Sequence, residues 1–438
     1  MAKKKKIKKR LFKNIIFFVI FICVIFLIVN KLFRKNGDDY IKDDEKYTLD
    51  FNIVDKIEAD SDSIEEIFED GMSISDFKNI LLQKENYIEK NGKYNLINYD
   101  FDRKLHYSEI ENIIYNMNNS DIVNVEVIGK SLDNRNIYGI EIGNGKDVLY
   151  IDANVHAAEV ASTLLLTRFL SEIINDYESG DKNIVSALND VKIAIIPCMN
   201  PDGYEIYNFG VESLNNKDLW VYQNKDKINF SLIKSNANGV DLNRNFPTQN
   251  AGMYFKGNKL INNVSLEKTT STSKYFNGYS VGSESETKAA MYFMLKHFRN
   301  TYAYINMHSQ GRVIYAGKPN LSNEFNELTS KFAKKISSIN KYTVHGLSSE
   351  EVGEGNDGSV TDFMAELANG FDFSSKSGRL YTDKHINNSC TLEYRYPVIT
   401  LETMNLWTSD PDFFKNEYYY HGIRDMFYKL LDKNYIID

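Results

Sequence analysis

The sequence predicts an α/β protein with a mixed, mostly parallel twisted sheet and helices on both of its faces, preceded by an N-terminal transmembrane helix. Short, almost wholly apolar runs such as Val148–Ala153 and Val191–Pro197 are typical of strands buried on both faces. Segments with helical spacing alternate with these runs, which favours a sheet covered on both sides. A long apolar stretch within a basic N-terminus indicates the transmembrane helix.

The N-terminal residues have the composition of a membrane anchor. Residues 1–35 carry eleven Lys or Arg and no acid, and Ile15–Val29 is apolar throughout. We predict a cytoplasmic basic tip at residues 1–14 and a transmembrane signal anchor at residues 15–33, because flanking lysines can reach the membrane interfaces and positive charge is retained in the cytoplasm. A cleaved signal peptide is the alternative, but no small-residue cleavage site follows the apolar stretch.

The remaining chain is acidic and is predicted to lie outside the cell. Residues 34–98 are expected to be an acidic stalk and linker, in which Ser73–Lys90 has helical spacing, and residues 99–438 one folded domain. Beyond residue 35, 52 − 11 = 41 bases stand against 60 acids, so nucleic acid is not an expected partner. The three scattered cysteines exclude a disulfide framework and a thiolate metal cluster. Any metal would need His and carboxylate ligands.

The secondary structure from residue 99 onward is predicted from periodicity. A hairpin is expected where the alternating segments Asn124–Ile128 and Ile137–Ile142 flank a turn at residues 133–135. The expected helices are Tyr107–Met117, Val160–Tyr177 and Glu284–Phe298. The expected buried strands are Val148–Ala153, Val191–Pro197, Ala303–Met307 and Val398–Thr403. Ligand sites in such sheets lie at the carboxyl ends of the strands.

Two histidines each follow a predicted buried strand. One begins the motif His156-x-x-Glu159, and the other, His308, comes directly after Tyr302–Met307. Two imidazoles, one carboxylate and an open position form the ligand set of a catalytic zinc ion. We therefore predict His156, Glu159 and His308 as metal ligands. The other histidines are expected to be structural or exposed: His106, His297, His345, His385 and His421.

Further motifs occur in a fixed order along residues 100–430. They are Asn200-Pro-Asp-Gly203, Asp241-x-Asn243-Arg244-Asn245-Phe246, His308-Ser-x-Gly311 and a final Thr-x-Glu strand. Together with His156-x-x-Glu159 this order resembles the zinc carboxypeptidase A-type family, the funnelin metallocarboxypeptidases, in a bacterial-type member. Each motif alone is modest, but five in the family's order are specific.

The resemblance implies the roles of several residues. It implies one Zn²⁺ per chain on the three predicted ligands and a role for Asp241 in orienting a ligand histidine, which metal-bound imidazole generally requires. It also implies that Asn243 and Arg244 bind the free carboxylate of the substrate. The residue types suit that role, because the guanidinium fork matches a carboxylate and Asn adds an uncharged donor.

The sequence offers two candidates for the catalytic glutamate. Glu393 lies in Cys390-Thr-Leu-Glu393-Tyr-Arg395, which resembles the animal digestive enzymes, and Glu402 ends Pro397-Val-Ile-Thr-Leu-Glu402, which resembles many bacterial members. We favour Glu402 as the general base because its strand is the more continuously apolar. Glu393 is the alternative.

The chain also departs from the digestive relatives. Ala158 replaces the Arg of their His-x-Arg-Glu motif. Near Trp220, where those relatives carry an Arg that stabilises the oxyanion, this chain has Val221 and Tyr222, and Lys225 is the replacement that we consider. Their side-chain preference is therefore not expected here.

The resemblance implies a hydrolase that cuts peptide bonds near a free carboxylate. A Tyr that caps the substrate in the digestive group is missing from residues 347–357, ahead of the matching stretch 358–363. With the predicted anchor, this favours cell-wall stem peptides (muropeptides with γ-D-glutamyl–diaminopimelate bonds) as substrates. A general extracellular peptide carboxypeptidase is the alternative, and a catalytically inactive peptide-binding module is a third reading.

Overall fold

The computed structural model describes most of the predicted domain. The described residues are 79–216 except Leu81, and 233–248, 253–256, 259–262, 276–278, 282–317, 321–346, 358–368, 396–404 and 417–437. The predicted basic tip, the signal anchor and most of the stalk lie outside them. Among the described residues, no helix combines the length and the apolar character needed to cross a membrane.

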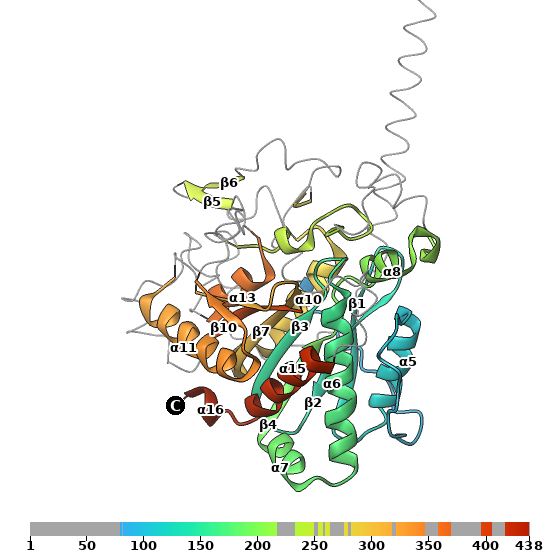
Figure 1. Cartoon of the computed structure of the whole chain (residues 1–438). Helices are drawn as coiled ribbons and strands as arrows, with labels where there is room; N and C mark the ends of the chain where they lie inside the picture. The colour runs from blue at the N-terminus through green and yellow to red at the C-terminus, as the bar shows by residue number, and fades with distance from the viewer. Residues whose placement is uncertain are drawn as a thin grey trace, which may run out of the picture. The chain divides into compact units, whose positions relative to one another are not determined.

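A mixed sheet of eight strands forms the centre of the domain (Figure 1), in the order β1–β2–β4–β3–β7–β10–β8–β9. Parallel pairing joins β4 to β3, β3 to β7, β7 to β10 and β8 to β9, and the other neighbours are antiparallel. The strands are β1 (Val123–Lys130), β2 (Asn136–Ile142), β3 (Asp147–Ala153), β4 (Val191–Ile196), β7 (Thr301–Ser309), β8 (Val313–Ala316), β9 (Thr343–His345) and β10 (Val398–Thr403). A separate antiparallel pair comprises β5 (Met253–Lys256) and β6 (Lys259–Asn262).

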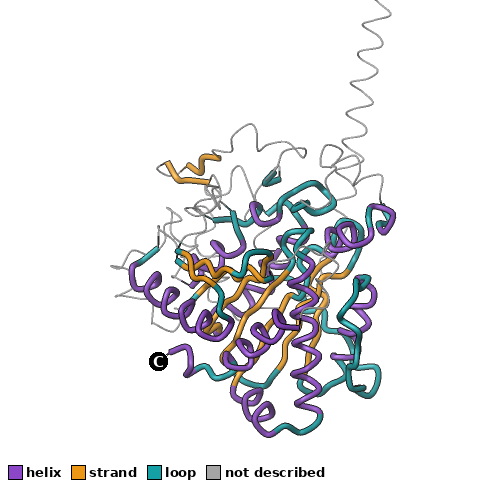
Figure 2. The backbone as a smooth tube through the Cα atoms, in the orientation of Figure 1, coloured by secondary structure: helices purple, strands orange, loops and turns teal. Residues whose placement is uncertain are grey.

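Helices cover both faces of the sheet (Figure 2). Alternate residues of β3 divide between two cores, with Leu149 and Ile151 packing in one and Tyr150 in the other. The first core includes α5 (Tyr107–Met117), α6 (Val160–Glu178) and α15 (Glu417–Leu430), and the second includes α10 (Ser285–His297) and α13 (Val360–Ala368). The remaining helices are α7 (Lys182–Asp190), α8 (Pro201–Phe209), α11 (Asn323–Asn340) and α16 (Asn434–Ile437), with short 3₁₀ turns η1 (Val211–Ser213), η3 (Leu242–Arg244) and η5 (Phe298–Asn300).

Helix α10 packs closely on the hairpin of β1 and β2. A Cβ added at Gly129 would lie 2.6 Å from Cβ of Ala289, and one added at Gly139 would lie 2.5 Å from the Phe293 ring. Only glycine leaves room for the helix at such an approach. The middle of α10 is thus held firmly against the hairpin.

The mixed α/β fold predicted from the sequence is confirmed, and the predicted strands and helices of the domain are present. Ser73–Lys90, whose apolar spacing is helical, is not helical over residues 82–90. Ile88 N–H donates to the Val125 carbonyl at 2.8 Å, and Val127 N–H donates to the Asn86 carbonyl at 3.0 Å. Pairing with the open edge of β1 outweighs the helical spacing, because it satisfies backbone groups that the edge would otherwise expose.

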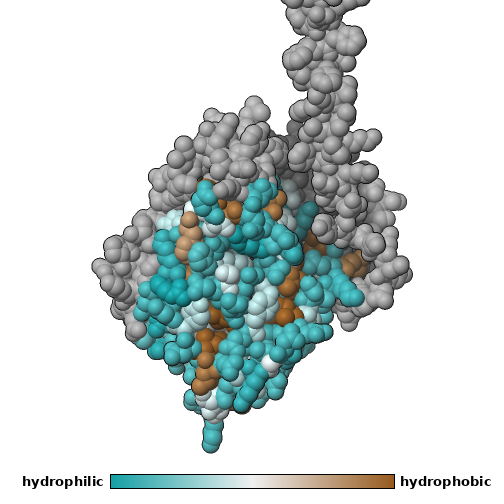
Figure 3. Space-filling model, turned by 90° about the vertical axis from the view of Figure 1, so that its right-hand side faces the viewer, coloured by the Kyte–Doolittle hydropathy of each residue, from teal (hydrophilic) through white to brown (hydrophobic). Residues whose placement is uncertain are grey.

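The face in Figure 3 is mainly hydrophilic, with narrow apolar strips between polar side chains. The large apolar side chains that are exposed among the described residues stand singly along the chain: Leu82, Tyr87, Leu96, Tyr115 and Leu132. Scattered exposure of this kind is ordinary for a folded surface.

Candidate functional site

The predicted metal ligands converge on one point. Nδ1 of His156 lies 2.7 Å from Oε1 of Glu159, and Nδ1 of His308 lies 2.7 Å from Oε2 of the same carboxylate. The three side chains are buried, and their ligand atoms all lie within 4.8 Å of one another. Residues that are 149 positions apart in the sequence thus present two imidazoles and a carboxylate to a shared space.

The strand order explains this convergence. Strands β3 and β7 are parallel neighbours, with Ala153 opposite Met307, so the turn after β3 and the end of β7 lie at the same edge of the sheet. Asn154 begins the turn with φ of 58°, a left-handed conformation that Asn tolerates. The turn packs against the start of α8, where a Cβ at Gly203 would lie 2.6 Å from that of Ala157. The glycine of the Asn-Pro-Asp-Gly motif is therefore needed for the ligand turn to fit.

Asp241 fixes the orientation of His156. Its Oδ1 lies 3.4 Å from Nε2 of His156 and also accepts a hydrogen bond from Asn243 N–H at 3.0 Å. Burial opposes the charge of Asp241, but His156 and Arg244 outweigh it and hold the pKa of the carboxyl below its ordinary value. With Nε2 directed at Asp241, Nδ1 of His156 is left to face the metal position.

The electrostatics suit a bound cation. Burial alone would raise the pKa of Glu159, but the two imidazoles outweigh it and lower the pKa below its ordinary value. Burial alone would lower the pKa of His156, yet Glu159 and Asp241 together raise it. The group therefore holds an ionised carboxylate between two imidazoles. Zn²⁺ fits this donor set, since two imidazoles and one carboxylate are ligands that it prefers.

Glu402 lies beside the ligands on the adjacent strand. In the parallel pairing of β10 with β7, Glu402 is directly opposite His308. Its side chain is partly exposed. Burial raises the pKa of Glu402 to about 7, with Glu159 acting in the same direction and His308 opposing it. A pKa near neutrality is suited to a general base. Glu393, the alternative candidate, lies outside the described residues.

The loop after Asp241 carries the predicted carboxylate-binding residues. Oδ1 of Asn243 accepts Val360 N–H at 3.0 Å, so the NH₂ group is the part of this amide that can donate to a substrate. Nη1 of Arg244 donates to the Asn243 carbonyl at 2.8 Å. Gly358 packs on the same loop, where a Cβ would lie 2.5 Å from the Arg244 carbonyl oxygen. The loop and the start of α13 therefore form one packed unit next to the ligands.

Lys234 also lies beside the ligands, although no motif marked it in the sequence. Its carbonyl accepts Ala157 N–H at 3.3 Å, so it runs alongside the ligand-bearing turn. Its side chain is partly exposed, whereas that of Ile233 is buried. Its positive charge acts on His156 and on Glu402, where it favours the deprotonated form. The only signal in the sequence was a basic residue seven positions before Asp241, and spacing alone does not place it at a reaction site.

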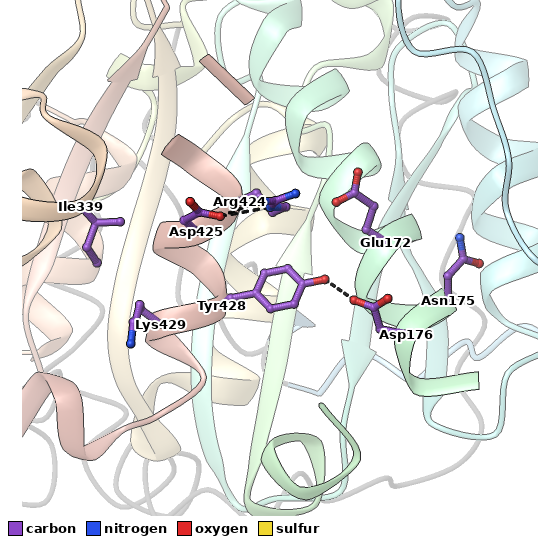
Figure 4. Close-up of a pocket in the computed structure, with 8 residues that line it drawn as sticks. All are labelled: Glu172, Asn175, Asp176, Ile339, Arg424, Asp425, Tyr428 and Lys429. Carbon is purple, nitrogen blue, oxygen red and sulfur yellow. Dashed lines mark hydrogen bonds and ion pairs between the residues drawn. The ribbon is translucent and has the colours of Figure 1, made fainter. Parts of the chain in front are cut away.

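Several residues considered from the sequence cannot be placed relative to this group, because the structure does not describe them. Trp220, Val221, Tyr222, Lys225 and residues 347–357 lie outside the described residues, as does His385. A pocket of about 890 Å³ lies between α6 and α15 (Figure 4) and contains none of the predicted site residues. Within it Arg424 Nη2 pairs with Asp425 at 2.9 Å, and the Tyr428 hydroxyl donates to Oδ2 of Asp176 at 2.5 Å.

Comparison with known proteins decides the family. The profile described as zinc carboxypeptidase matches residues 110–394. The chain belongs to the zinc carboxypeptidase family. The matched range contains His156, Glu159, Asp241, Asn243, Arg244 and His308, and it ends between Glu393 and Glu402.

Relatives within the zinc carboxypeptidase family share moderate identity with this chain. It is 29% identical over 159 residues to the carboxypeptidase N catalytic chain of Homo sapiens, covering 34% of this chain and 32% of the relative. It is 26% identical over 265 residues to carboxypeptidase A2 of Rattus norvegicus, covering 59% and 56%. The chain thus spans about a third to about half of the length of these relatives.

The fold is similar to that of a solved structure. The structure of bovine thrombin-activatable fibrinolysis inhibitor in complex with tick carboxypeptidase inhibitor matches with a TM-score of 0.54 at 19% identity, covering 77% of this chain and 98% of that one. At this identity the likeness establishes the zinc carboxypeptidase fold.

We expect the purified protein to bind close to one zinc ion per chain. His156→Ala or His308→Ala should each remove most of the zinc, because losing one of three protein ligands greatly weakens such a site. Metal analysis after dialysis measures this, with His421→Ala, an exposed histidine outside the group, as the control. Stoichiometric zinc in both ligand variants would show that the metal binds elsewhere.

Proposed function

We propose that this protein is a zinc-dependent metallocarboxypeptidase, a hydrolase that cuts peptide bonds near a free carboxylate. The observation that carries the proposal is the position of Glu402 directly opposite His308, next to a group that fits zinc. Asp241 links this centre to the loop of Arg244, a residue suited to bind a substrate carboxylate. A metal centre, a base and a carboxylate-binding cation in one place are the parts that such a reaction needs.

Each group of the chain has a distinct part in the proposed reaction. Zinc, when bound by His156, Glu159 and His308, supplies Lewis acidity to the scissile carbonyl and to water. Glu402 takes a proton from the attacking water and delivers it to the leaving amine. Arg244 binds the carboxylate of the substrate and so holds the scissile bond in position for attack.

Lys234 supplies the positive charge for the oxyanion in this proposal. It takes the role that the sequence suggested for Lys225, because its carbonyl accepts a hydrogen bond from Ala157 in the turn that carries His156 and Glu159. A fixed charge beside the carbonyl stabilises the negative oxygen as it develops.

For the substrate, we propose cell-wall stem peptides of the γ-D-glutamyl–diaminopimelate type. The support is the predicted anchor at residues 15–33, which would hold the domain against the wall, and the absence of a Tyr from residues 347–357. A general extracellular peptide carboxypeptidase is the second candidate, favoured by the similarity to carboxypeptidase N and carboxypeptidase A2. The presence of all three ligands with Arg244 argues against an inactive peptide-binding module. Single-turnover assays on muropeptides and on linear peptides with a free C-terminus separate these candidates.

We expect Arg244→Ala to lower kcat/KM by ~10- to 100-fold on a substrate with a free carboxylate, because one charge-assisted hydrogen bond contributes ~1.5–3 kcal/mol. The effect should be much smaller when that carboxylate is amidated, since the interaction is then already missing. Glu402→Gln should abolish turnover of both substrates and leave zinc bound. Equal losses on both substrates for Arg244→Ala would assign that residue a structural role, and an active Glu402→Gln beside an inactive Glu393→Gln would make Glu393 the base.

We expect Lys234→Gln to lower kcat by ~10²- to 10³-fold with a smaller change in KM, the effect of removing a donor that stabilises an oxyanion. Lys234→Arg should retain most activity because the charge is kept. Lys130→Gln, an exposed lysine on β1, is the matched control. Full activity of Lys234→Gln with normal zinc content would exclude this role.

The proposed topology places the domain outside the cell, with the N-terminus in the cytoplasm of a single-pass membrane protein. Protease added to intact protoplasts should then remove an epitope at the C-terminus and spare one at residue 1, because the membrane shields only the cytoplasmic tip. The reverse pattern would overturn the topology. A released form that begins near residue 36 would instead indicate a cleaved signal peptide.

A further inference from the structure

The segment that begins α10 binds the carboxylate-binding loop at the far end of that loop. Gly282 N–H donates to the Asn245 carbonyl at 2.7 Å, and Glu284 N–H donates to Oδ1 of Asn245 at 3.2 Å. Nδ2 of Asn245 donates in turn to Oγ of Ser283 at 3.2 Å. The residue directly after Arg244 is therefore fixed by three hydrogen bonds to one short segment.

The same segment binds the near end of the loop through two carboxylates. Nδ2 of Asn236 donates to Oε2 of Glu284 at 2.8 Å and to Oε2 of Glu286 at 3.3 Å. Oδ1 of Asn236 accepts the backbone N–H groups of Asn238 and Val240 at 3.0 and 3.1 Å. Asn236 thereby shapes the turn that leads directly into Asp241, and Glu284 and Glu286 hold Asn236.

The carboxylates of Glu284 and Glu286 both accept hydrogen bonds from Nδ2 of Asn236, and both are buried. Glu284 is 6% exposed and Glu286 is 1% exposed. Within the described part of the chain, neither forms an ion pair with Lys, Arg or His, and Oε1 of Glu286 has no hydrogen-bond partner. The nearby carboxylate of Asp202 adds negative charge and is itself paired with Arg135 at 2.9 Å. Two buried, adjacent carboxylates without a cation cannot both be ionised at low cost.

We propose that Glu286 is a positioning residue for the carboxylate-binding loop and that it holds the loop as a neutral, protonated carboxyl group. The proposal rests on the proposed function, in which Arg244 of this loop binds the substrate carboxylate. The proton removes the repulsion from Glu284, so that both side chains can remain on Asn236. Ser285, whose Oγ donates to Oε2 of Glu286 at 3.1 Å, is the other polar group on this carboxyl.

The ionisation of Glu286 connects the loop to pH. Burial raises the pKa of Glu286 to about 8, and the carboxylates of Glu284 and Asp202 act in the same direction. Loss of the proton would place a second negative charge against Glu284 and weaken the hold on Asn236. The turn before Asp241 would loosen, and Arg244 would bind the substrate carboxylate less well. Alkaline pH should therefore raise KM for substrates with a free carboxylate and leave kcat less affected.

The experiment compares pH profiles of the wild type with those of Glu286→Gln, which imitates the neutral carboxyl group and cannot ionise. For the zinc-loaded protein we expect KM of the wild type to rise ~10-fold between pH 7 and pH 9, as a single ionisation near pH 8 requires. Glu286→Gln should lack this rise, and Glu284→Gln should move it to lower pH, because the negative charge that raises the pKa of Glu286 is gone. On an amidated substrate the KM profiles should coincide. Glu327→Gln, an exposed glutamate of α11, is the matched control.

Thermal unfolding gives a second measurement that does not need activity. In the unfolded chain Glu286 loses its proton near its ordinary pKa of about 4.5, and in the folded chain near pH 8. The stability that protonated Glu286 gives is complete below the lower value and is lost as pH rises to the upper one. The Tm of Glu286→Gln relative to wild type should therefore increase from pH 5 to pH 8 and then stay level.

The outcomes separate the two proposals. Identical KM profiles for wild type, Glu284→Gln and Glu286→Gln would overturn the positioning role. A Tm difference independent of pH would show that Glu286 carries no proton in the folded protein. If no variant and no wild-type protein hydrolyses any carboxylate substrate, the proposed function fails, and the Tm comparison still decides whether Glu286 is protonated.

Discussion

The contact between Asp241 and His156 joins the candidate metal centre to the loop that carries Asn243 and Arg244. On one side Asp241 turns His156 so that Nδ1 faces Glu159, and on the other it accepts the N–H of Asn243. Its own N–H donates to the Phe276 carbonyl at 2.7 Å, which holds the residue from a third direction. A shift of this one carboxylate would disturb His156 and the loop of Asn243 and Arg244 together, so the surrounding loop must be held rigidly.

That rigidity is obtained by burying charged groups at the edge of the sheet. Glu159 and Asp241 keep their charge because imidazoles lie against them, whereas Glu402 and Glu286 have raised pKa values because burial is not fully compensated. The difference follows from the neighbours of each carboxylate. Glu402 gains a pKa useful to a base, and Glu286 is suited to hold a proton and to act through hydrogen bonds.

Much of the fold follows from local sequence patterns. The apolar runs at β3, β4, β7 and β10 and the helical spacing of α5, α6 and α10 were sufficient to predict these elements, because burial on both faces leaves few alternatives to such runs. Residues 82–90 show where local patterns fail. Their helical spacing was real, but the open edge of β1 offered backbone hydrogen bonds that no local signal encodes.

For the site, the sequence alone predicted the ligand set, since His156-x-x-Glu159 and His308 are of the residue types that bind zinc, and the structure brings these three side chains together. Only the tertiary structure placed Glu402 opposite His308, because the register of β10 on β7 pairs residues that are 94 positions apart in the sequence. It alone brought Lys234 to the ligand turn and brought Glu284 and Glu286 to Asn236. Those residues act through packing across the sheet edge, and spacing along a chain carries no information about which loops will meet there.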